Sequence, residues 1–220
     1  MNAHRPNHQA SGFNRVELLV IIGILAFLVL MIFPALYAAK YKHYGRIHCV
    51  MNLKEIGIAL RSEGSQDPMR VVFTNTETMK RVTNGNAYLL WQSLSNRLSS
   101  PNALHCYDDR RRKAAQSFSQ GFSNDNISYF FNLDAPATYP QLILAGDRNV
   151  WVDGSAAKPG LLTLSTNTVI GWTTEQHRRV GNLLMADGSC MQVTSNGLKM
   201  AFAEAFGVST NITSSRLVIP

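Results

Sequence analysis

The residues best suited to chemistry are a histidine and an aspartate in the last quarter of the chain. His177 is separated by nine residues from the dipeptide Asp187-Gly188. His177 precedes an expected strand and Asp187 lies in an expected turn, so the two side chains could form a hydrogen-bonded pair. Acid–base catalysis would also need a substrate pocket and usually a nucleophile. The sequence has no Gly-x-Ser-x-Gly elbow, phosphate-binding loop or clustered carboxylates, so we predict a structural pair and no enzymatic activity.

Cysteines and histidines offer a disulfide or a metal site. If the chain is exported, two of its three cysteines could pair, and the residue spacing leaves all three pairings open. The side chains that could bind zinc are scattered: His48, Cys49, His105, Cys106, His177 and Cys190. None shows the paired Cys-x2-Cys or His-x3-His spacing of a structural zinc site, so we predict no metal site.

Charged residues suggest two further kinds of ligand. Calcium could bind at Asp147, Asp153 or Asp187, but no loop has the dense Asp/Asn spacing of a dedicated calcium site, and we predict no cofactor. The net charge is +7, and the densest basic run is Arg110-Arg111-Arg112-Lys113. Such a run could bind an anion or a nucleic acid, but it is more often solvated surface, so we do not expect a nucleic-acid partner.

An apolar run from Leu18 to Ala39 follows a single acidic residue, Glu17. A helix of this length would cross about 30 Å of hydrocarbon at about 1.5 Å per residue. A carboxylate beside hydrocarbon is costly and usually has a partner, so Glu17 is expected to be paired. The run is longer than the roughly 7–15 apolar residues of a secretory signal peptide. A plain signal anchor remains an alternative, because basic residues flank both ends.

The helix is expected to continue into a soluble region and to cover residues 13–64. One face of its second half carries apolar residues at helical spacing: Cys49, Leu53, Ile56 and Leu60. Glu63-Gly64-Ser65 supplies a stop. Pro34 lies inside the helix and lacks a backbone N–H, so we expect a kink or local unwinding there.

Residues 65–220 predict a small α+β domain with an antiparallel sheet, against which the long helix packs. A polar segment with a short strand at 71–73 should precede a helix over Asn86–Leu98. The expected strands are Ile127–Leu133, Gln141–Ala145, Leu161–Leu164, Thr168–Thr174, Asn182–Ala186 and Cys190–Thr194.

The end of the domain has the clearest local signals. Asp187-Gly188 between two strands predicts a tight type I′ hairpin, and Thr168–Thr174 would pair beside it in a three-stranded meander. A helix over Asn196–Phe206 would cover one face of the sheet. The Ser/Thr-rich tail from Val208 is expected to be a loop or a surface strand.

The N-terminal residues resemble the processing signal of type IV prepilins and type II secretion pseudopilins. Gly12-Phe13, with Glu17 four residues beyond Phe13 and an apolar helix directly behind it, matches that pattern. The resemblance implies that prepilin peptidase removes a leader, residues 1–12, and methylates Phe13. It also implies that Glu17 meets the N-terminal amine of a neighbouring subunit in a helical filament. Pilin-like helices often carry a proline at the depth of Pro34.

The domain resembles the H-x9-DG branch of prepilin-type proteins. His177 and Asp187-Gly188 have the defining spacing, and further segments follow the family's order: Cys49–Gly57, Leu104–Asp109, Ile127–Asn132 and Ala145–Asn149. The family often continues Asp-Gly-His, whereas Ser189-Cys190 follows here, so no catalytic or metal role is carried over. The resemblance favours a Cys49–Cys106 disulfide because both cysteines lie in family segments, with Cys106–Cys190 as the alternative.

Together the two resemblances imply a pseudopilin, a structural subunit of a type II secretion or type IV pilus-like filament. They imply a single-pass inner-membrane protein whose C-terminal domain lies in the periplasm and which enters a fibre on assembly. The implied partners are copies of the chain, other pseudopilins, the prepilin peptidase, the assembly platform and membrane lipid. The alternatives are a DNA-uptake or adhesive pilin that uses the basic run, and a membrane-anchored exported enzyme.

Overall fold

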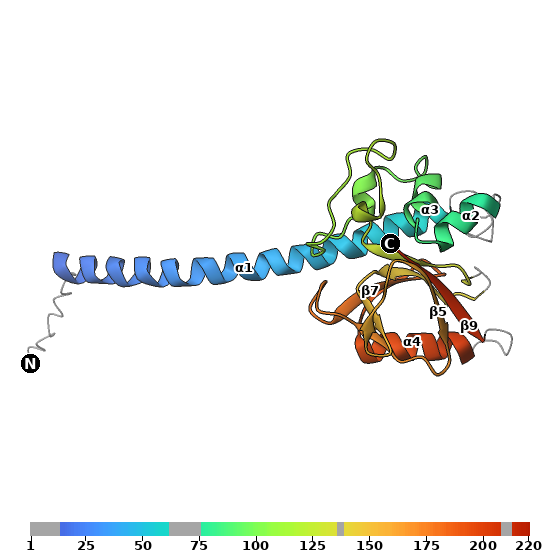
Figure 1. Ribbon diagram of the computed structural model, residues 1–220. Helices are drawn as coiled ribbons and strands as arrows, with labels where there is room; N and C mark the ends of the chain where they lie inside the picture. Colours follow the sequence, from blue (N-terminus) through green and yellow to red (C-terminus); the bar gives the residue numbers. More distant parts are fainter. Residues whose placement is uncertain (1–13, 62–75, 136–138, 208–212) are drawn as a thin grey trace, which may run out of the picture. The chain divides into compact units, whose positions relative to one another are not determined.

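The computed structural model describes residues 14–61, 76–135, 139–207 and 213–220, without the side chains of 38–44 and 46 (Figure 1). The chain forms two compact units, one ending at His43 and the other running over Tyr44–Pro220. Helix α1, Arg15–Arg61, begins in the first unit and ends in the second. The expected leader and the expected cleavage site at Gly12 and Phe13 lie outside the described residues, as does the strand expected at 71–73.

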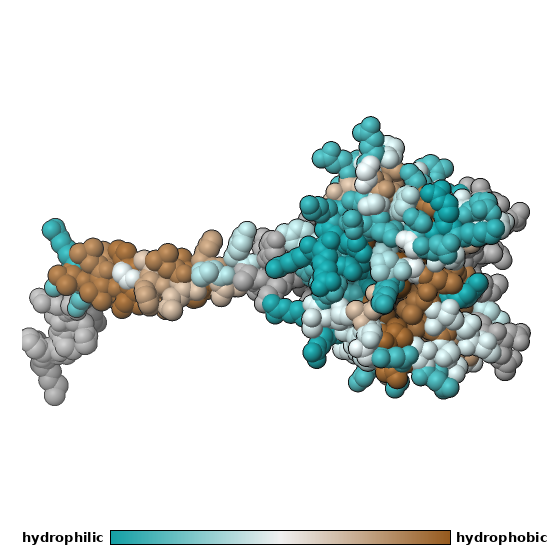
Figure 2. Space-filling view, in the orientation of Figure 1, coloured by the Kyte–Doolittle hydropathy of each residue, from teal (hydrophilic) through white to brown (hydrophobic). Residues whose placement is uncertain are grey.

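The first unit is the apolar part of α1. Its segment Arg15–Tyr37, 23 residues, is long and apolar enough to cross a membrane. All its side chains are exposed, and Figure 2 shows a hydrophobic surface over most of this segment. A kink or local unwinding was expected at Pro34, and the backbone remains helical through this residue, so there is no unwinding. The expectation of a long N-terminal apolar helix is confirmed.

The second unit contains two antiparallel sheets, which confirms the α+β class. The larger sheet has six strands in the order β5 (Gly160–Ser165), β9 (Ser214–Ile219), β1 (Tyr129–Asn132), β2 (Ile143–Asp147), β7 (Val180–Met185) and β8 (Cys190–Thr194). The smaller sheet has the order β4 (Ser155–Ala156), β3 (Val150–Val152) and β6 (Ile170–Trp172). The helices are α2 (Thr76–Thr83), α3 (Tyr88–Ser93), α4 (Ser195–Gly207) and the 3-10 turns η1 (Pro101–Leu104) and η2 (Asn124–Asn126).

The core lies on both faces of the larger sheet, because neighbouring residues of a strand point to opposite sides. On one face Phe131 and Leu184 pack in a cluster with the predicted stripe of α1: Cys49, Leu53, Ile56 and Leu60. On the other face Phe130 and Leu183 pack with Phe202 of α4 and with residues of the smaller sheet. The larger sheet is therefore sandwiched between the end of α1 and a layer that contains α4.

Several boundaries and pairings differ from the sequence-based expectation. The helix expected over Asn86–Leu98 shortens to α3, and the preceding polar segment contains α2. The expected strand Thr168–Thr174 shortens to β6, which pairs with β3 in the smaller sheet, so the predicted meander is wrong. The tail is also more than a surface strand, because β9 lies between β5 and β1 and is largely buried.

The β7–β8 hairpin forms as predicted, but its turn is of another type. The Gly188 N–H donates to the Met185 carbonyl, so Ala186 and Asp187 are the central residues. Gly188 alone of the dipeptide is left-handed, with φ of 83°. The structure therefore has a turn followed by a left-handed glycine, and the type I′ prediction was wrong because it needs Asp187 to be left-handed as well.

The position of β9 can be tested through Leu217, whose side chain is fully buried between two strands. We expect Leu217→Ala to lower the free energy of unfolding of the full chain in detergent by about 2–5 kcal/mol, because it leaves a cavity. Tryptophan fluorescence in urea measures the effect, since all three tryptophans lie in the second unit. Met200→Ala, at a side chain that is 71% exposed, should change it by about 0.5 kcal/mol or less. Equal effects of the two substitutions would contradict a central β9.

Candidate functional site

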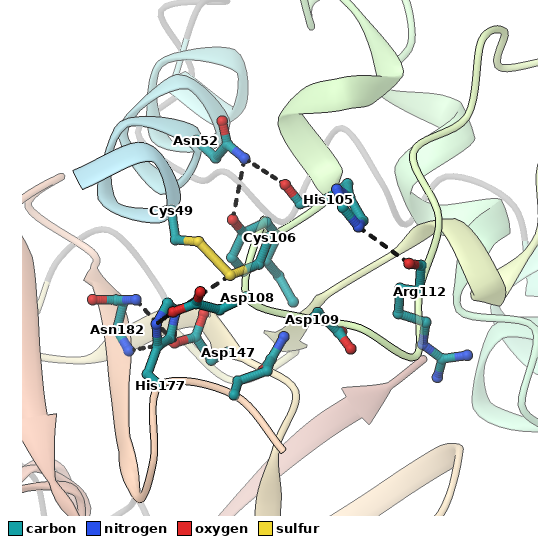
Figure 3. Close-up of a disulfide and its surroundings, with 12 residues drawn as sticks. Cys49, Asn52, His105, Cys106, Asp108, Asp109, Arg112, Asp147, His177 and Asn182 are labelled. Carbon is teal, nitrogen blue, oxygen red and sulfur yellow. Dashed lines mark hydrogen bonds and ion pairs between the residues drawn. A yellow bond between two sulfur atoms is a disulfide. The ribbon is translucent and has the colours of Figure 1, made fainter. Parts of the chain in front are cut away.

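A disulfide joins α1 to the loop after η1. Cys49 and Cys106 are both fully buried, with Cα atoms 5.2 Å apart and a sequence separation of 57 (Figure 3). This is the pair that the family resemblance favoured. Cys190 is the free cysteine and is partly buried. The bond closes a long loop and fixes the segment after η1 against the helix.

His177 lies against this disulfide between two carboxylates. Its Nδ1 is 2.7 Å from Oδ2 of Asp108, and its imidazole is fully buried. Its Nε2 is 3.2 Å from Sγ of Cys106 and 3.5 Å from Oδ2 of Asp147. The prediction that His177 pairs with Asp187 is therefore wrong. The histidine pairs instead with residues from the Cys106 loop and from β2, which are remote from it in sequence.

The backbone that carries His177 is strained. His177, Arg178 and Arg179 all have positive φ, at 46°, 54° and 68°. A left-handed conformation costs a residue with a side chain roughly 1–2 kcal/mol, and consecutive cases are rare. The buried contacts of the imidazole hold this turn in place. Strain of this kind is concentrated at sites where the position of a side chain matters.

Asp147 is the second buried carboxylate of the cluster. Its Oδ2 accepts hydrogen bonds from the backbone N–H and the side-chain amide of Asn182, at 2.7 and 3.0 Å. Its Oδ1 is buried and has no hydrogen-bond partner among the described residues. Burial raises the pKa of Asp147 to about 6, because desolvation outweighs the stabilisation of the carboxylate by His177 and Asn182.

The loop that carries Cys106 and Asp108 is fixed from several sides. Asp109, which is buried, forms a two-point ion pair with Arg148, with N–O distances of 2.7 and 2.8 Å. Asn52 of α1 donates to the His105 carbonyl at 2.8 Å. The Cys106 loop is thus held to both α1 and the sheet, as Figure 3 shows for Asn52 and His105. A fixed loop keeps Asp108 within reach of His177.

The Asp187-Gly188 end of the motif contacts the other end of the same helix. Arg61, the last residue of α1, donates to the Ala186 carbonyl. Gly188 has a positive φ, which favours glycine, and a Cβ there would displace the Arg61 guanidinium from the turn. Asp187 is exposed, and its pKa is lowered by the Ser189 side chain and by the Ser189 backbone N–H, which donates to it at 2.7 Å.

The motif spacing thus matches the length of helix that it spans. His177 lies beside the disulfide of Cys49, and Gly188 lies beside Arg61. Cys49 and Arg61 are twelve residues apart on α1, a helix length of about 18 Å. The six residues of β7 between the two ends of the motif cover about 20 Å. A histidine and a glycine separated by one such strand therefore hold both ends of the helical segment against the sheet.

The candidate calcium ligands are dispersed, and the basic run is partly neutralised by ion pairs. Asp153 accepts the Val169 N–H at 3.0 Å in the smaller sheet, away from the position of Asp147 on β2. Two residues of the basic run are paired: Arg111 with Glu175 and Arg112 with Asp125, each at 2.8 Å. The run therefore presents less positive charge than its sequence suggests.

The first turn of α1 contains a single acidic residue, Glu17. Glu17 Oε2 accepts the Asn14 N–H at 3.0 Å, and the Val16 N–H lies 3.5 Å from Asn14 Oδ1. This is the arrangement of a capping box, in which a side chain three residues into the helix satisfies the backbone of the cap residue. Glu17 therefore stabilises the start of its own helix.

Two residues of the His177 cluster were not singled out for it by sequence reasoning. Asp147 was considered only for calcium, and Asp108 only as part of a family segment. The available signal was that Asp108 follows Cys106 by two residues, so that a disulfide at Cys106 would fix the position of Asp108.

A search of protein-family models, curated proteins and solved structures finds no match to this chain.

The raised pKa of Asp147 predicts an unusual pH dependence of stability. The folded state binds the Asp147 proton more tightly than the unfolded state, whose ordinary pKa is 3.8. The stabilisation from this proton is fully present below about pH 4 and lost as the pH rises through about 6. Asp147→Asn removes this titration. The free energy of unfolding at pH 7.5 minus that at pH 4 should therefore be larger for Asp147→Asn than for wild type, by up to about 3 kcal/mol.

Urea unfolding of the oxidised full chain in detergent, followed by tryptophan fluorescence at both pH values, measures this change. Asp153→Asn is the matched control, because its carboxylate is exposed. Parallel pH profiles for wild type and Asp147→Asn would show that the Asp147 pKa is not raised.

Proposed function

We propose that this chain is a pseudopilin, a structural subunit of a type II secretion or type IV pilus-like filament, and that prepilin peptidase processes it. The observation that carries the proposal is the apolar segment Arg15–Tyr37, which is wholly exposed and begins with a single carboxylate, Glu17. Monomeric soluble proteins rarely expose an apolar surface of this extent. The segment therefore needs lipid, or copies of itself, around it.

Lipid and the apolar helices of other subunits are similar surroundings for such a segment. Leucine-rich side chains gain little on moving from lipid to a bundle of apolar helices, because both surroundings are hydrocarbon. A specific pairing is needed to favour the bundle over the dispersed membrane protein. In this proposal the pairing is between Glu17 and the N-terminal amine of Phe13 in a neighbouring subunit, which neutralises a charge that is costly in hydrocarbon.

The contact of Glu17 within its own helix is compatible with this role. The capping box engages Oε2 with one backbone N–H, which is a weak compensation for a full negative charge. An ammonium group from another subunit supplies the opposite charge that a backbone N–H lacks. Assembly is also expected to depend on Pro34, farther along the same helix, through its effect on the shape of the helix.

The cellular arrangement follows from the same proposal. The chain is held in the inner membrane by its one candidate membrane-spanning helix in the described residues, with the second unit in the periplasm. Its partners are copies of itself, other pseudopilins, the prepilin peptidase and the assembly platform. The second unit, with its own two-sided core, forms the outer layer of the fibre.

The proposal predicts that the charge of Glu17, and not its hydrogen bond, drives assembly. Glu17→Gln keeps an oxygen for the Asn14 N–H, since glutamine also forms capping boxes, but it removes the charge. We expect at least about a tenfold loss of sheared filaments from cells, which corresponds to about 1.4 kcal/mol per subunit contact. Immunoblots of sheared and membrane fractions measure the ratio.

Glu204→Gln, at an exposed acidic residue of α4, is the matched control and should leave filament yield unchanged. The Glu17→Gln chain should remain in the membrane fraction at the wild-type level. A wild-type filament yield from Glu17→Gln would contradict the proposed pairing.

A further inference from the structure

The buried cluster around the disulfide contains a set of metal ligands. In the part of the chain that the structure describes, one group of three metal-ligating residues gathers its ligand atoms within 4.8 Å: Cys49, Cys106 and His177. All three are buried. Two thiolates and an imidazole are preferred ligands of Zn²⁺, and structural zinc sites bind four such groups in a tetrahedron. The reduced form of this cluster therefore has three of the four ligands.

Asp147 is the candidate for the fourth ligand, and it lies beside His177 but outside the group of ligand atoms gathered within 4.8 Å. Its carboxylate is fully buried, Oδ2 lies 3.5 Å from His177 Nε2, and Oδ1 has no hydrogen-bond partner among the described residues. An unpartnered buried carboxylate oxygen is costly, and a cation would satisfy it. Carboxylate oxygens bind Zn²⁺ at about 2.0–2.2 Å.

The distances from His177 to two of the proposed ligands are close to those around a tetrahedral ion. Bond lengths of about 2.0–2.3 Å to zinc place tetrahedral ligands roughly 3.3–3.8 Å from one another. His177 Nε2 lies 3.2 Å from Cys106 Sγ and 3.5 Å from Asp147 Oδ2. The sulfur atoms of Cys49 and Cys106 are bonded in the oxidised chain and must separate to admit an ion. The Asp147 carboxylate must also move toward them, because it lies outside the group gathered within 4.8 Å.

The other ring nitrogen of His177 has the partner that zinc-bound histidines usually have. Nδ1 lies 2.7 Å from the Asp108 carboxylate, at ion-pair distance but without hydrogen-bond geometry. A small rotation that lets Nδ1–H donate to Asp108 would leave the Nε2 lone pair for an ion near Cys106 and Asp147. The left-handed turn from His177 to Arg179 holds the ring in this position. Asp108 therefore orients the ligand without binding the ion.

We propose that the reduced chain binds one Zn²⁺ through Cys49 Sγ, Cys106 Sγ, His177 Nε2 and the Asp147 carboxylate, and that the Cys49–Cys106 disulfide excludes the ion. The same buried cluster thus has two alternative cross-links between α1 and the sheet domain. One is a metal ion in the reduced chain and the other is a disulfide in the oxidised chain. The proposal concerns the second unit alone and does not depend on filament assembly.

The exchange between the two states balances with a disulfide oxidant. When Zn²⁺ binds, the two thiols lose their protons to water and two Zn–S bonds form. On oxidation the Zn–S bonds break, the Cys49–Cys106 bond forms and Zn²⁺ leaves. The two electrons reduce the S–S bond of the oxidant to two thiols, which take up two protons from water. A dithiol and Zn²⁺ reverse the reaction.

Cobalt titration of the full chain in detergent tests this proposal. The chain is prepared oxidised, or reduced with a phosphine, and Co²⁺ is added while absorbance is recorded. We expect the reduced chain to bind one equivalent of Co²⁺, with thiolate-to-cobalt charge-transfer bands and the strong visible bands of a tetrahedral ion. Zn²⁺ should displace the Co²⁺ and remove these bands, and the oxidised chain should show neither.

Substitutions separate ligands from neighbours. Cys106→Ser should abolish the charge-transfer bands, and His177→Gln should weaken Co²⁺ binding at least about 100-fold. Asp108→Asn should weaken binding about 10–100-fold, as is typical for a residue that orients a ligand. The controls Cys190→Ser and His105→Gln should bind as wild type, because His105 Nε2 is directed at the Arg112 carbonyl and Cys190 is the cysteine outside the cluster.

Folding is checked for each variant by circular dichroism and tryptophan fluorescence. His177→Gln keeps both cysteines, so its oxidised form can be shown to fold before reduction. If the reduced wild type loses its native fluorescence without metal, Zn²⁺ should restore it. Absence of cobalt bands from the reduced wild type, wild-type binding by His177→Gln, or loss of binding in Cys190→Ser would each overturn the proposal.

Discussion

The apolar first part of α1 has no partner of its own within the described chain, and this constraint determines how the protein can exist. Full burial of a Leu, Ile or Phe side chain is worth about 1.5–3 kcal/mol, and the segment up to Tyr37 exposes twelve of these side chains. Lipid or other copies of the helix must therefore surround it. Only the second option supplies an opposite charge for Glu17, whose contact within its own helix is a single backbone N–H.

The second part of the same helix has the opposite environment, because the sheet domain buries one face of it completely. Contacts at two positions along the helix hold it there. Near Cys49 the disulfide and His177 bind the helix to the Cys106 loop, and at Arg61 the guanidinium covers the β7–β8 turn at Gly188. The strand between the two positions is about as long as the helix between them. The histidine and the Asp-Gly dipeptide are therefore parts of one attachment, although they do not touch each other.

Local sequence patterns predicted the elements whose structure depends on residues close together in the chain. The apolar run, the helical stripe ending at Leu60 and the β7–β8 hairpin depend on residue spacing and turn chemistry. The place of β9 in the sheet depends on strands far away in sequence, and its Ser/Thr-rich flank is typical of a surface tail. The partners of His177 were missed for the same reason, because Asp108 and Asp147 reach it only through tertiary contacts. The scattered cysteines and histidines likewise lacked a spacing that could reveal their convergence.

The most direct test of the account is the mass of the mature N-terminus in the native host. A filament subunit of this class must lose its leader before the charge at Glu17 can meet a neighbouring amine. The account predicts a mature chain that begins at Phe13 and carries one methyl group on its amine, and that keeps residues 1–12 when the peptidase is absent. A mature chain that still begins at Met1, in cells with an active peptidase, would contradict it.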